Sequence, residues 1–334
     1  MQVLAGDIGG TKTLLAIAEV SEQAGAVRVD VLERRRYDSH RFPGLAAVCQ
    51  AFAAELARPL PDRAGFGVAG PVARGRSQAT NLAWVLDEDD LARTLGLARV
   101  RLANDFVTLA LGIPAVKPAD LVTLNEGVRV DGGVIAIIGA GTGLGEATAL
   151  RGPDGRLQVF PSEGGHCDFA PRTEREIAVL RYLLARFEHV SWERVLSGEG
   201  LVSLAEALAQ AGGLALPPPV LLAARDDRKR APAAVTDAAA AGDPLCRQAL
   251  QLFCSLYGAE AGNLALKTLP AGGLFVAGGI APRILDSLKD GRFREAFLSK
   301  GRMRPVLEQI PVQIVLNTDV GLLGAASLAA TSLP

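Results

Sequence analysis

The sequence has few aromatic residues and no long apolar run. Aromatic side chains make up 5% of the 334 residues while 49% of the residues are hydrophobic, so aliphatic side chains must fill most of the core. A core of this kind is typical of parallel strands covered by helices. Glycine, proline or a charged residue interrupts every candidate run of about 18 apolar residues, the length that a membrane-spanning helix needs. We therefore expect a soluble α/β protein with no membrane partner.

An excess of charge and a metal-binding cysteine pattern are also missing. The chain has 35 basic and 36 acidic residues, which argues against nucleic acid or anionic lipid as a partner. Its four cysteines show no C-x-x-C spacing, which argues against a zinc site and a secreted disulfide framework. The one basic cluster, Arg34, Arg35 and Arg36, is expected on a solvated face between a strand and a loop. With no signal-peptide pattern at the start, we expect a cytoplasmic location.

The length of the chain and the order of its patterns predict two α/β domains. Strand, glycine-rich turn and strand follow one another over 3–18 and again over 134–150, which suggests an internal duplication. The segment after residue 170 is mostly helical in pattern. Further strands are expected at 64–68, 100–103 and 274–277, and helices at 45–56, 106–111, 174–187, 200–210, 243–269, 282–288 and 321–331.

Both glycine-rich turns have the composition of a phosphate-binding loop. Glycines let the backbone approach an anion and direct its N–H groups inward. Neither turn has the spacing of a Walker loop or of a dinucleotide-binding loop. One such turn alone would be explained as a tight hairpin, but two of them favour phosphate binding.

Polar side chains in these turns suit a nucleotide bound with Mg²⁺. Asp7 could hold the metal directly or through water, or it could accept a hydrogen bond in an Asx-turn. Thr11 and Thr142 could donate hydroxyl groups to phosphate oxygens. Lys12 could supply positive charge, or it could point to solvent.

Asn104 and Asp105 follow a buried strand and precede an apolar helix. This places a carboxylate at the carboxyl end of a strand, where α/β folds bind their ligands. A hydroxyl is a poor nucleophile, so a carboxylate that accepts its proton would suit phosphoryl transfer, and Asp105 is our candidate catalytic base. Both residues are also favoured helix caps, and the pattern alone does not separate the two roles.

A third polar group is Glu163-Gly164-Gly165-His166. Its carboxylate and imidazole are three residues apart across two glycines, a spacing that suits adjacent hydroxyls of one small polyol. Glu193 begins a short polar stretch before Gly198, and it would equally serve as an acidic residue at a helix N-terminus.

Six segments in this order resemble the bacterial glucokinases of the non-ROK group, which belong to the actin-like, hexokinase-type ATPase superfamily. ROK kinases have a cysteine-rich zinc motif after the corresponding histidine, whereas only Cys167 follows His166 here. One departure is Lys12, where many glucokinases of this group have Asn. The matching segments are Gly6-Asp7-Ile8-Gly9-Gly10-Thr11, Asn104-Asp105-Phe106, Gly139-Ala140-Gly141-Thr142-Gly143-Leu144-Gly145, Glu163-Gly164-Gly165-His166 with Asp168-Phe169-Ala170-Pro171, Glu193-Arg194-Val195-Leu196-Ser197-Gly198 and Ala277-Gly278-Gly279-Ile280.

The resemblance implies a two-domain actin-like (ribonuclease H-like) sugar-kinase fold with an interdomain cleft that closes on the sugar. Residues 1–113 with 312–334 would form a small α/β domain, and 114–311 a larger, helix-rich domain. It further implies a homodimer that transfers the γ-phosphoryl group of ATP to the 6-hydroxyl of glucose, with Mg²⁺. The implied roles are ATP binding by Gly6, Asp7, Ile8, Gly9, Gly10, Thr11, Lys12, Gly141, Thr142, Gly143, Gly278 and Gly279, glucose binding by Asn104, Asp105, Glu163, His166 and Glu193, and proton removal by Asp105.

Three alternatives compete with glucose phosphorylation. Another acceptor, such as mannose, fructose or an N-acetylhexosamine, would use the same phosphate apparatus, and the sequence does not give the selectivity. A sugar-responsive DNA-binding regulator would need a helix-turn-helix before the first turn, where only six residues precede Asp7. An actin-like ATPase without a sugar would not need the polar groups at Asn104-Asp105 and at 163–166.

Overall fold

The computed structural model describes residues 1–23, 26–78, 82–153, 155–226 and 228–331. Contacts within the chain divide it into two compact units, the first formed by Met1–Asp120, Gly152–Pro161 and Asn317–Pro334, the second by Leu121–Arg151 and Ser162–Leu316. The limits expected from the sequence, 113 and 312, lie near Asp120 and Asn317. The grouping of Gly152–Pro161 with the first unit was not predicted.

The first unit is built on a five-stranded sheet with the strand order β3-β2-β1-β4-β8. Strands β1, β2 and β3 are antiparallel neighbours, so the first glycine turn closes a hairpin as predicted. Strands β1, β4 and β8 run parallel. The elements are β1 (Gln2–Ile8), β2 (Lys12–Gln23), β3 (Ala26–Asp38), η1 (Ser39–Arg41), α1 (Leu45–Leu56), β4 (Arg63–Val68), α2 (Glu88–Leu95), β8 (Arg99–Asn104), α3 (Asp105–Gly112), η2 (Ile113–Ala115), η3 (Pro118–Asp120), α12 (Val320–Ala330) and a small sheet of β5 (Val72–Ala73), β6 (Arg76–Gln78) and β7 (Val85–Asp87).

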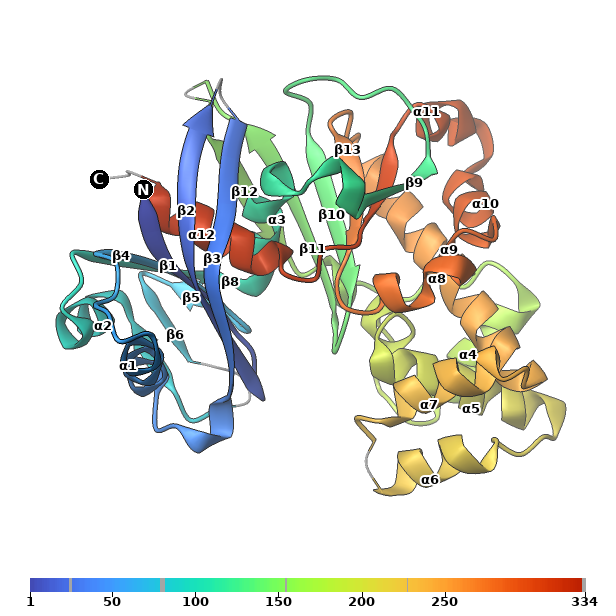
Figure 1. Cartoon of the computed structure of the whole chain (residues 1–334). Helices are drawn as coiled ribbons and strands as arrows, with labels where there is room; N and C mark the ends of the chain where they lie inside the picture. Colours follow the sequence, from blue (N-terminus) through green and yellow to red (C-terminus); the bar gives the residue numbers. More distant parts are fainter. Residues whose placement is uncertain (24–25, 79–81, 154, 227, 332–334) are drawn as a thin grey trace. The chain divides into compact units, whose positions relative to one another are not determined.

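The alternation of side chains along β1 buries both faces of this sheet. Leu4 and Ile8 pack in one cluster with Phe52 of α1 and with β4 and β8. Val3 and Ala5 pack on the opposite face against α12, since successive side chains of a strand point to opposite faces. Figure 1 shows α12, in red, lying along this sheet although it comes from the end of the chain.

Glycines let α3 and α12 approach each other closely. A Cβ atom on Gly324 would overlap the carbonyl oxygen of Thr108, and one on Gly112 would overlap that of Val320. A Cβ atom on Gly67 of β4 would likewise overlap the Thr108 hydroxyl. Because α3 begins at Asp105, this packing fixes where the candidate base lies on the sheet.

The second unit contains most of a six-stranded sheet with the order β12-β11-β10-β13-β14-β9. Strands β10 and β11 form an antiparallel hairpin around the second glycine turn, as predicted, while β10 and β13 are parallel. The elements are β9 (Leu121–Asn125), β10 (Ile135–Ala140), β11 (Leu144–Arg151), β12 (Leu157–Ser162), η4 (Gly164–His166), α4 (Glu174–Leu184), η5 (Trp192–Arg194), α5 (Gly198–Gly212), α6 (Pro218–Asp226), α7 (Ala231–Ala240), α8 (Pro244–Thr268), β13 (Gly273–Ala277), η6 (Ala281–Ile284), α9 (Leu285–Leu288), α10 (Arg292–Leu298), η7 (Gly301–Met303), α11 (Arg304–Glu308) and β14 (Val312–Val315).

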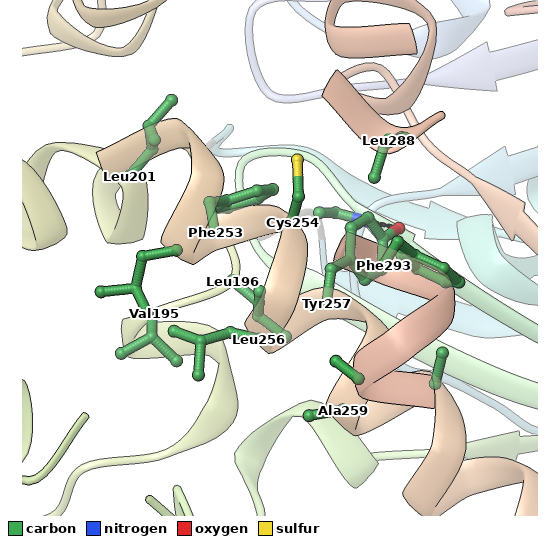
Figure 2. Close-up of a cluster of buried hydrophobic side chains, with 14 of the residues drawn as sticks. Val195, Leu196, Leu201, Phe253, Cys254, Leu256, Tyr257, Ala259, Leu288 and Phe293 are labelled. Carbon is green, nitrogen blue, oxygen red and sulfur yellow. Dashed lines mark hydrogen bonds between the residues drawn. The ribbon is translucent and has the colours of Figure 1, made fainter. Parts of the chain in front are cut away.

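The long helix α8 lies at the centre of this unit. Its Tyr257 is fully buried and makes edge-to-face ring contacts with Phe253 and Phe293, side chains that Figure 2 shows together. The Tyr257 hydroxyl accepts a 2.9 Å hydrogen bond from the N–H of Ala140, so the core helix holds the end of β10 where the second glycine turn begins.

Several local expectations needed correction. The helix expected over 282–288 is a 3₁₀ turn followed by the single turn α9. The helix expected to reach residue 187 ends at Leu184, because the N–H groups of Arg186 and Phe187 both bond to the Leu183 carbonyl. Arg34, Arg35 and Arg36 lie inside β3 rather than beside a loop. All four cysteines are free thiols, and no helix in the described part of the chain is long and apolar enough to cross a bilayer.

Candidate active site

In the first unit, the carboxyl ends of three parallel strands meet at one edge of the sheet. Ile8 pairs with Val68, and Val68 pairs with Asn104. Asp7, Asn104 and Asp105 therefore come to the same edge although about a hundred residues separate them in sequence. This is the edge where α/β sheets bind ligands.

Asn104 and Asp105 form the start of α3. Asn104 is the N-cap: its Oδ1 accepts a 2.9 Å bond from the N–H of Phe106, and its Nδ2 donates to Gly70 O at 3.1 Å. Asp105 Oδ1 accepts from the same N–H at 2.9 Å, and this residue is half-buried. The capping role is thus real, but Asn104 already performs it, so the capping reading does not by itself account for a carboxylate at residue 105.

Asp7 lies in a region of concentrated negative charge. Burial raises its pKa to about 6, the charges of Asp105 and Asp319 raise it further, and Lys12 opposes them. Asp319 precedes α12 and was not predicted as part of the site. Three carboxylates with one lysine are a setting that a divalent cation would stabilise.

The donor set fits Mg²⁺ that is bound mainly by phosphate and water. Within the described residues, no three His, Cys, Asp or Glu side chains are grouped so as to hold a metal ion. Mg²⁺ commonly binds one or two carboxylates and keeps its other positions for substrate phosphates and water. Asp7 meets that requirement.

The first glycine turn is braced by the 3₁₀ helix η1. Gly9 N donates to Lys12 O at 3.0 Å, and Ser39 Oγ donates to Gly9 O at 3.2 Å. Thr11 and Lys12 are exposed and help to line an open pocket of about 460 Å³ with Arg36, Tyr37, Asp38 and His40. Both side chains can thus reach a ligand from solvent.

Gly6 and Ile8 have structural explanations. A Cβ atom on Gly6 would lie 2.6 Å from the ring of Phe66, and the Ile8 side chain is buried in the core beside it. Any contact of these two residues with phosphate would have to come from their backbone.

In the second unit, three glycine-containing segments meet at the end of β10. Gly141 N donates to Gly143 O at 2.8 Å, and Gly141 O accepts from Gly198 N, the start of α5, at 2.9 Å. Thr142, between them, is exposed. Gly278 has a φ of +86° and sits where a Cβ atom would be 2.6 Å from Ala140 O, so only glycine fits there. The neighbouring Gly279 is exposed and faces open space.

Glu163 and His166 stand at either end of the short helix η4. Their Oε2 and Nε2 atoms are 3.8 Å apart, with 90% and 59% of the side chains exposed. Gly164 and Gly165 between them are buried. The glycines pack inward, and the two polar groups are presented together to solvent, as the spacing predicted.

Leu144 joins the predicted sugar-binding residues to the second glycine turn. Its N–H donates to Glu193 Oε2 at 3.0 Å, and its carbonyl oxygen lies against Gly165, which has no room for a Cβ atom. The N–H of Trp192 donates to Cys167 O at 3.0 Å, which ties η5 to the segment after η4. Glu193 is therefore brought close to the segment 163–166.

Two carboxylates near these groups were missed. Asp319 lies 312 positions after Asp7 in the sequence, and no local pattern connects them. Glu146 is buried beneath Gly164, and it had a signal: it is the one charged residue between Leu144 and Leu150 of an otherwise uncharged strand.

Comparison with known proteins identifies the family. A model of the Glucokinase family matches residues 4–332. The glucokinase of Nostoc punctiforme is 44% identical over 340 residues, covering 98% of both chains. The crystal structure of a glucokinase from an Antarctic psychrotroph has a TM-score of 0.86 at 30% identity, covering 99% of both chains.

A more distant structure shares the fold alone. A ROK family glucokinase from Streptomyces griseus, solved in complex with glucose and AMPPNP, has a TM-score of 0.64 at 24% identity and covers 98% of this chain and 99% of that one. The predicted actin-like α/β sugar-kinase fold is thus confirmed. The chain belongs to the glucokinase family.

Proposed function

We propose that this chain phosphorylates the 6-hydroxyl of glucose with ATP and that Asp105 is the catalytic base. The observation that carries the assignment of the base lies within the first unit: Asp105 is at the sheet edge, close enough to Asp7 to raise its pKa. A proton acceptor and a metal-binding carboxylate are thus neighbours, as phosphoryl transfer requires.

The reaction follows from these positions. The ionised Asp105 accepts the proton of the sugar 6-hydroxyl as that oxygen attacks the γ-phosphorus. The bond from the γ-phosphorus to the bridging oxygen breaks, and ADP leaves with the electron pair. Backbone N–H groups of the turns at Gly9-Gly10 and Gly141–Gly143, with the hydroxyls of Thr11 and Thr142 and the charge of Lys12, stabilise the phosphates.

Asp7 would hold Mg²⁺, directly or through water. When bound with ATP, the ion supplies positive charge that offsets the phosphate oxygens and the carboxylates around Asp7. Gly278 and Gly279 would border the adenosine, because their backbone is exposed next to the end of β10.

Glucose is recognised by hydrogen bonds from both units. Asn104 and Asp105 belong to the first unit, and Glu163, His166 and Glu193 belong to the second. A ROK glucokinase with the same fold was solved with glucose and AMPPNP, which supports glucose and ATP as substrates for this fold. A homodimer and a cytoplasmic location are part of the same proposal, and sedimentation at micromolar concentration tests the dimer.

A coupled assay over a panel of hexoses tests the acceptor. ADP release is measured at one ATP concentration with glucose, mannose, fructose and N-acetylglucosamine. We expect kcat/KM to be highest with glucose, because each buried polar group must find its hydroxyl. Equal or higher kcat/KM with another hexose would overturn the glucose assignment.

A further inference from the structure

A buried carboxyl group supports the segment that carries Glu163 and His166. Glu146, on β11, is 2% exposed. Its Oε2 atom occupies the place where a Cβ atom of Gly164 would be, so the backbone of this segment rests directly on the carboxyl group. Gly165 rests in the same way on Leu144 O, two residues earlier on the same face of β11.

Glu146 meets a second buried carboxyl group from the core helix. Glu260 of α8 is 0% exposed. Among the residues that the structure describes, Glu146 Oε1 and Glu260 Oε1 have no hydrogen-bond partner. The other oxygen of Glu260 accepts from Asn263 Nδ2 at 2.7 Å, and Lys267 Nζ is 3.9 Å from Glu260 Oε1. Buried carboxylate oxygens without a donor are costly.

The charges around the pair favour one negative charge rather than two. Burial and the neighbouring charge of Glu260 raise the pKa of Glu146, and Lys267 opposes them. Burial also raises the pKa of Glu260. The Tyr257 hydroxyl lies near Glu146, and the remaining charged groups on the surrounding elements are Lys300, Arg172, Glu176 and Glu193. Two carboxyl groups in contact commonly share one proton.

We propose that Glu146 and Glu260 share one proton, and that this acid pair positions Gly164 and Gly165 so that Glu163 and His166 can bind the sugar. A shared proton gives both orphaned oxygens a partner. Loss of the proton at alkaline pH places two anions together beneath Gly164 and displaces the segment above. Glu146 is thus a positioning residue, and its readout through the sugar rests on the proposed function.

Kinetics across pH test the positioning role. Glucose KM and kcat are measured from pH 6.5 to 9.5 for wild type, Glu146→Gln and Glu146→Ala, with Glu206→Gln as the control. Glu206 is a carboxyl group of the same unit that is bound by Tyr182 and Arg186 on α4, away from η4.

We expect the wild-type glucose KM to rise at least about fivefold at the alkaline end, with a smaller change in kcat. Glu146→Gln, whose amide donates permanently to Glu260, should keep a low and pH-independent KM. Glu146→Ala should raise KM about tenfold at every pH, and the control should follow wild type. A wild-type pH profile in Glu146→Gln, or an unchanged KM in Glu146→Ala, would overturn the proposal.

Unfolding in urea separates this proposal from the proposed function, because it needs neither sugar nor ATP. A group whose pKa is raised on folding contributes stability that is complete below its unfolded pKa and is lost as pH rises through the folded pKa. Wild type should therefore lose stability relative to Glu146→Gln as the solution becomes alkaline. A pH-independent difference refutes the shared proton even if glucose is phosphorylated. The expected difference in a protein without glucose kinase activity supports the shared proton and refutes the function instead.

Discussion

Glu193 Oε2 accepts a 3.0 Å hydrogen bond from the N–H of Leu144. The same carboxylate fills the space beside Gly143, where a Cβ atom would overlap it. A residue proposed to bind glucose is thereby attached to the turn proposed to bind phosphate. Changes at Glu193 should therefore affect both substrates, to an extent that depends on the substituent.

Glu193→Gln and Glu193→Ala separate these two effects. The glutamine retains an oxygen that can accept from Leu144 N, so we expect the ATP KM to change less than about threefold while the glucose KM rises about tenfold, because a charged acceptor is lost. The alanine variant leaves that N–H without a partner and should raise both KM values. Initial rates with each substrate varied measure this, and an unchanged ATP KM in Glu193→Ala would disprove the link.

Gly324→Ala tests the close packing of α3 on α12. The added methyl group meets the Thr108 carbonyl, so we expect a loss of roughly 1–3 kcal/mol in the free energy of unfolding, as for overpacked cores. Gly321→Ala, in the same helix but with only Asp7 Oδ2 at 4.0 Å, is the control. It should be neutral or stabilise by up to about 1 kcal/mol, since alanine is the better helix former. Equal effects of the two variants in urea titrations would contradict this packing.

Local chemistry made much of the site predictable. Val100–Ala103 is a short apolar run that ends in Asn104 and Asp105, so the strand, the helix start and the carboxylate could be recognised together. The hairpin around Gly9 and Gly10 followed from the same kind of pattern. These features depend on neighbours in the sequence, which is why sequence reasoning found them.

The missed features depend on tertiary packing. Asp319 approaches Asp7 only because α12 packs on β1. Ser39 braces the first turn only because β3 returns beside β2, so that Ser39 N can donate to Thr11 O. Glu260 is an acidic residue in a helix whose neighbours are mostly apolar, but nothing in the sequence indicated that it would meet Glu146 across the core.

Asp7→Asn should stabilise the protein in the absence of Mg²⁺ and ATP. The pKa of Asp7 is raised from 3.8 to about 6, so its contribution to stability is complete below 3.8 and is lost as pH rises through about 6. We expect the variant to gain roughly 1–3 kcal/mol over wild type at pH 8 and almost nothing at pH 4. Urea titrations with a chelator measure this, with the exposed Asp89→Asn as control. A difference that does not change between these pH values would contradict the crowding of carboxylates around Asp7.

Asp105→Asn tests the central claim most directly. Asparagine keeps an oxygen that can accept from the N–H of Phe106, so α3 should start as before, but it cannot take a proton from the sugar. With ADP and glucose 6-phosphate both measured, we predict that kcat falls about 10²- to 10⁴-fold while the ATP KM stays within about threefold and the surface variant Asp62→Asn behaves as wild type. A kcat for Asp105→Asn within tenfold of wild type would show that another group removes the proton.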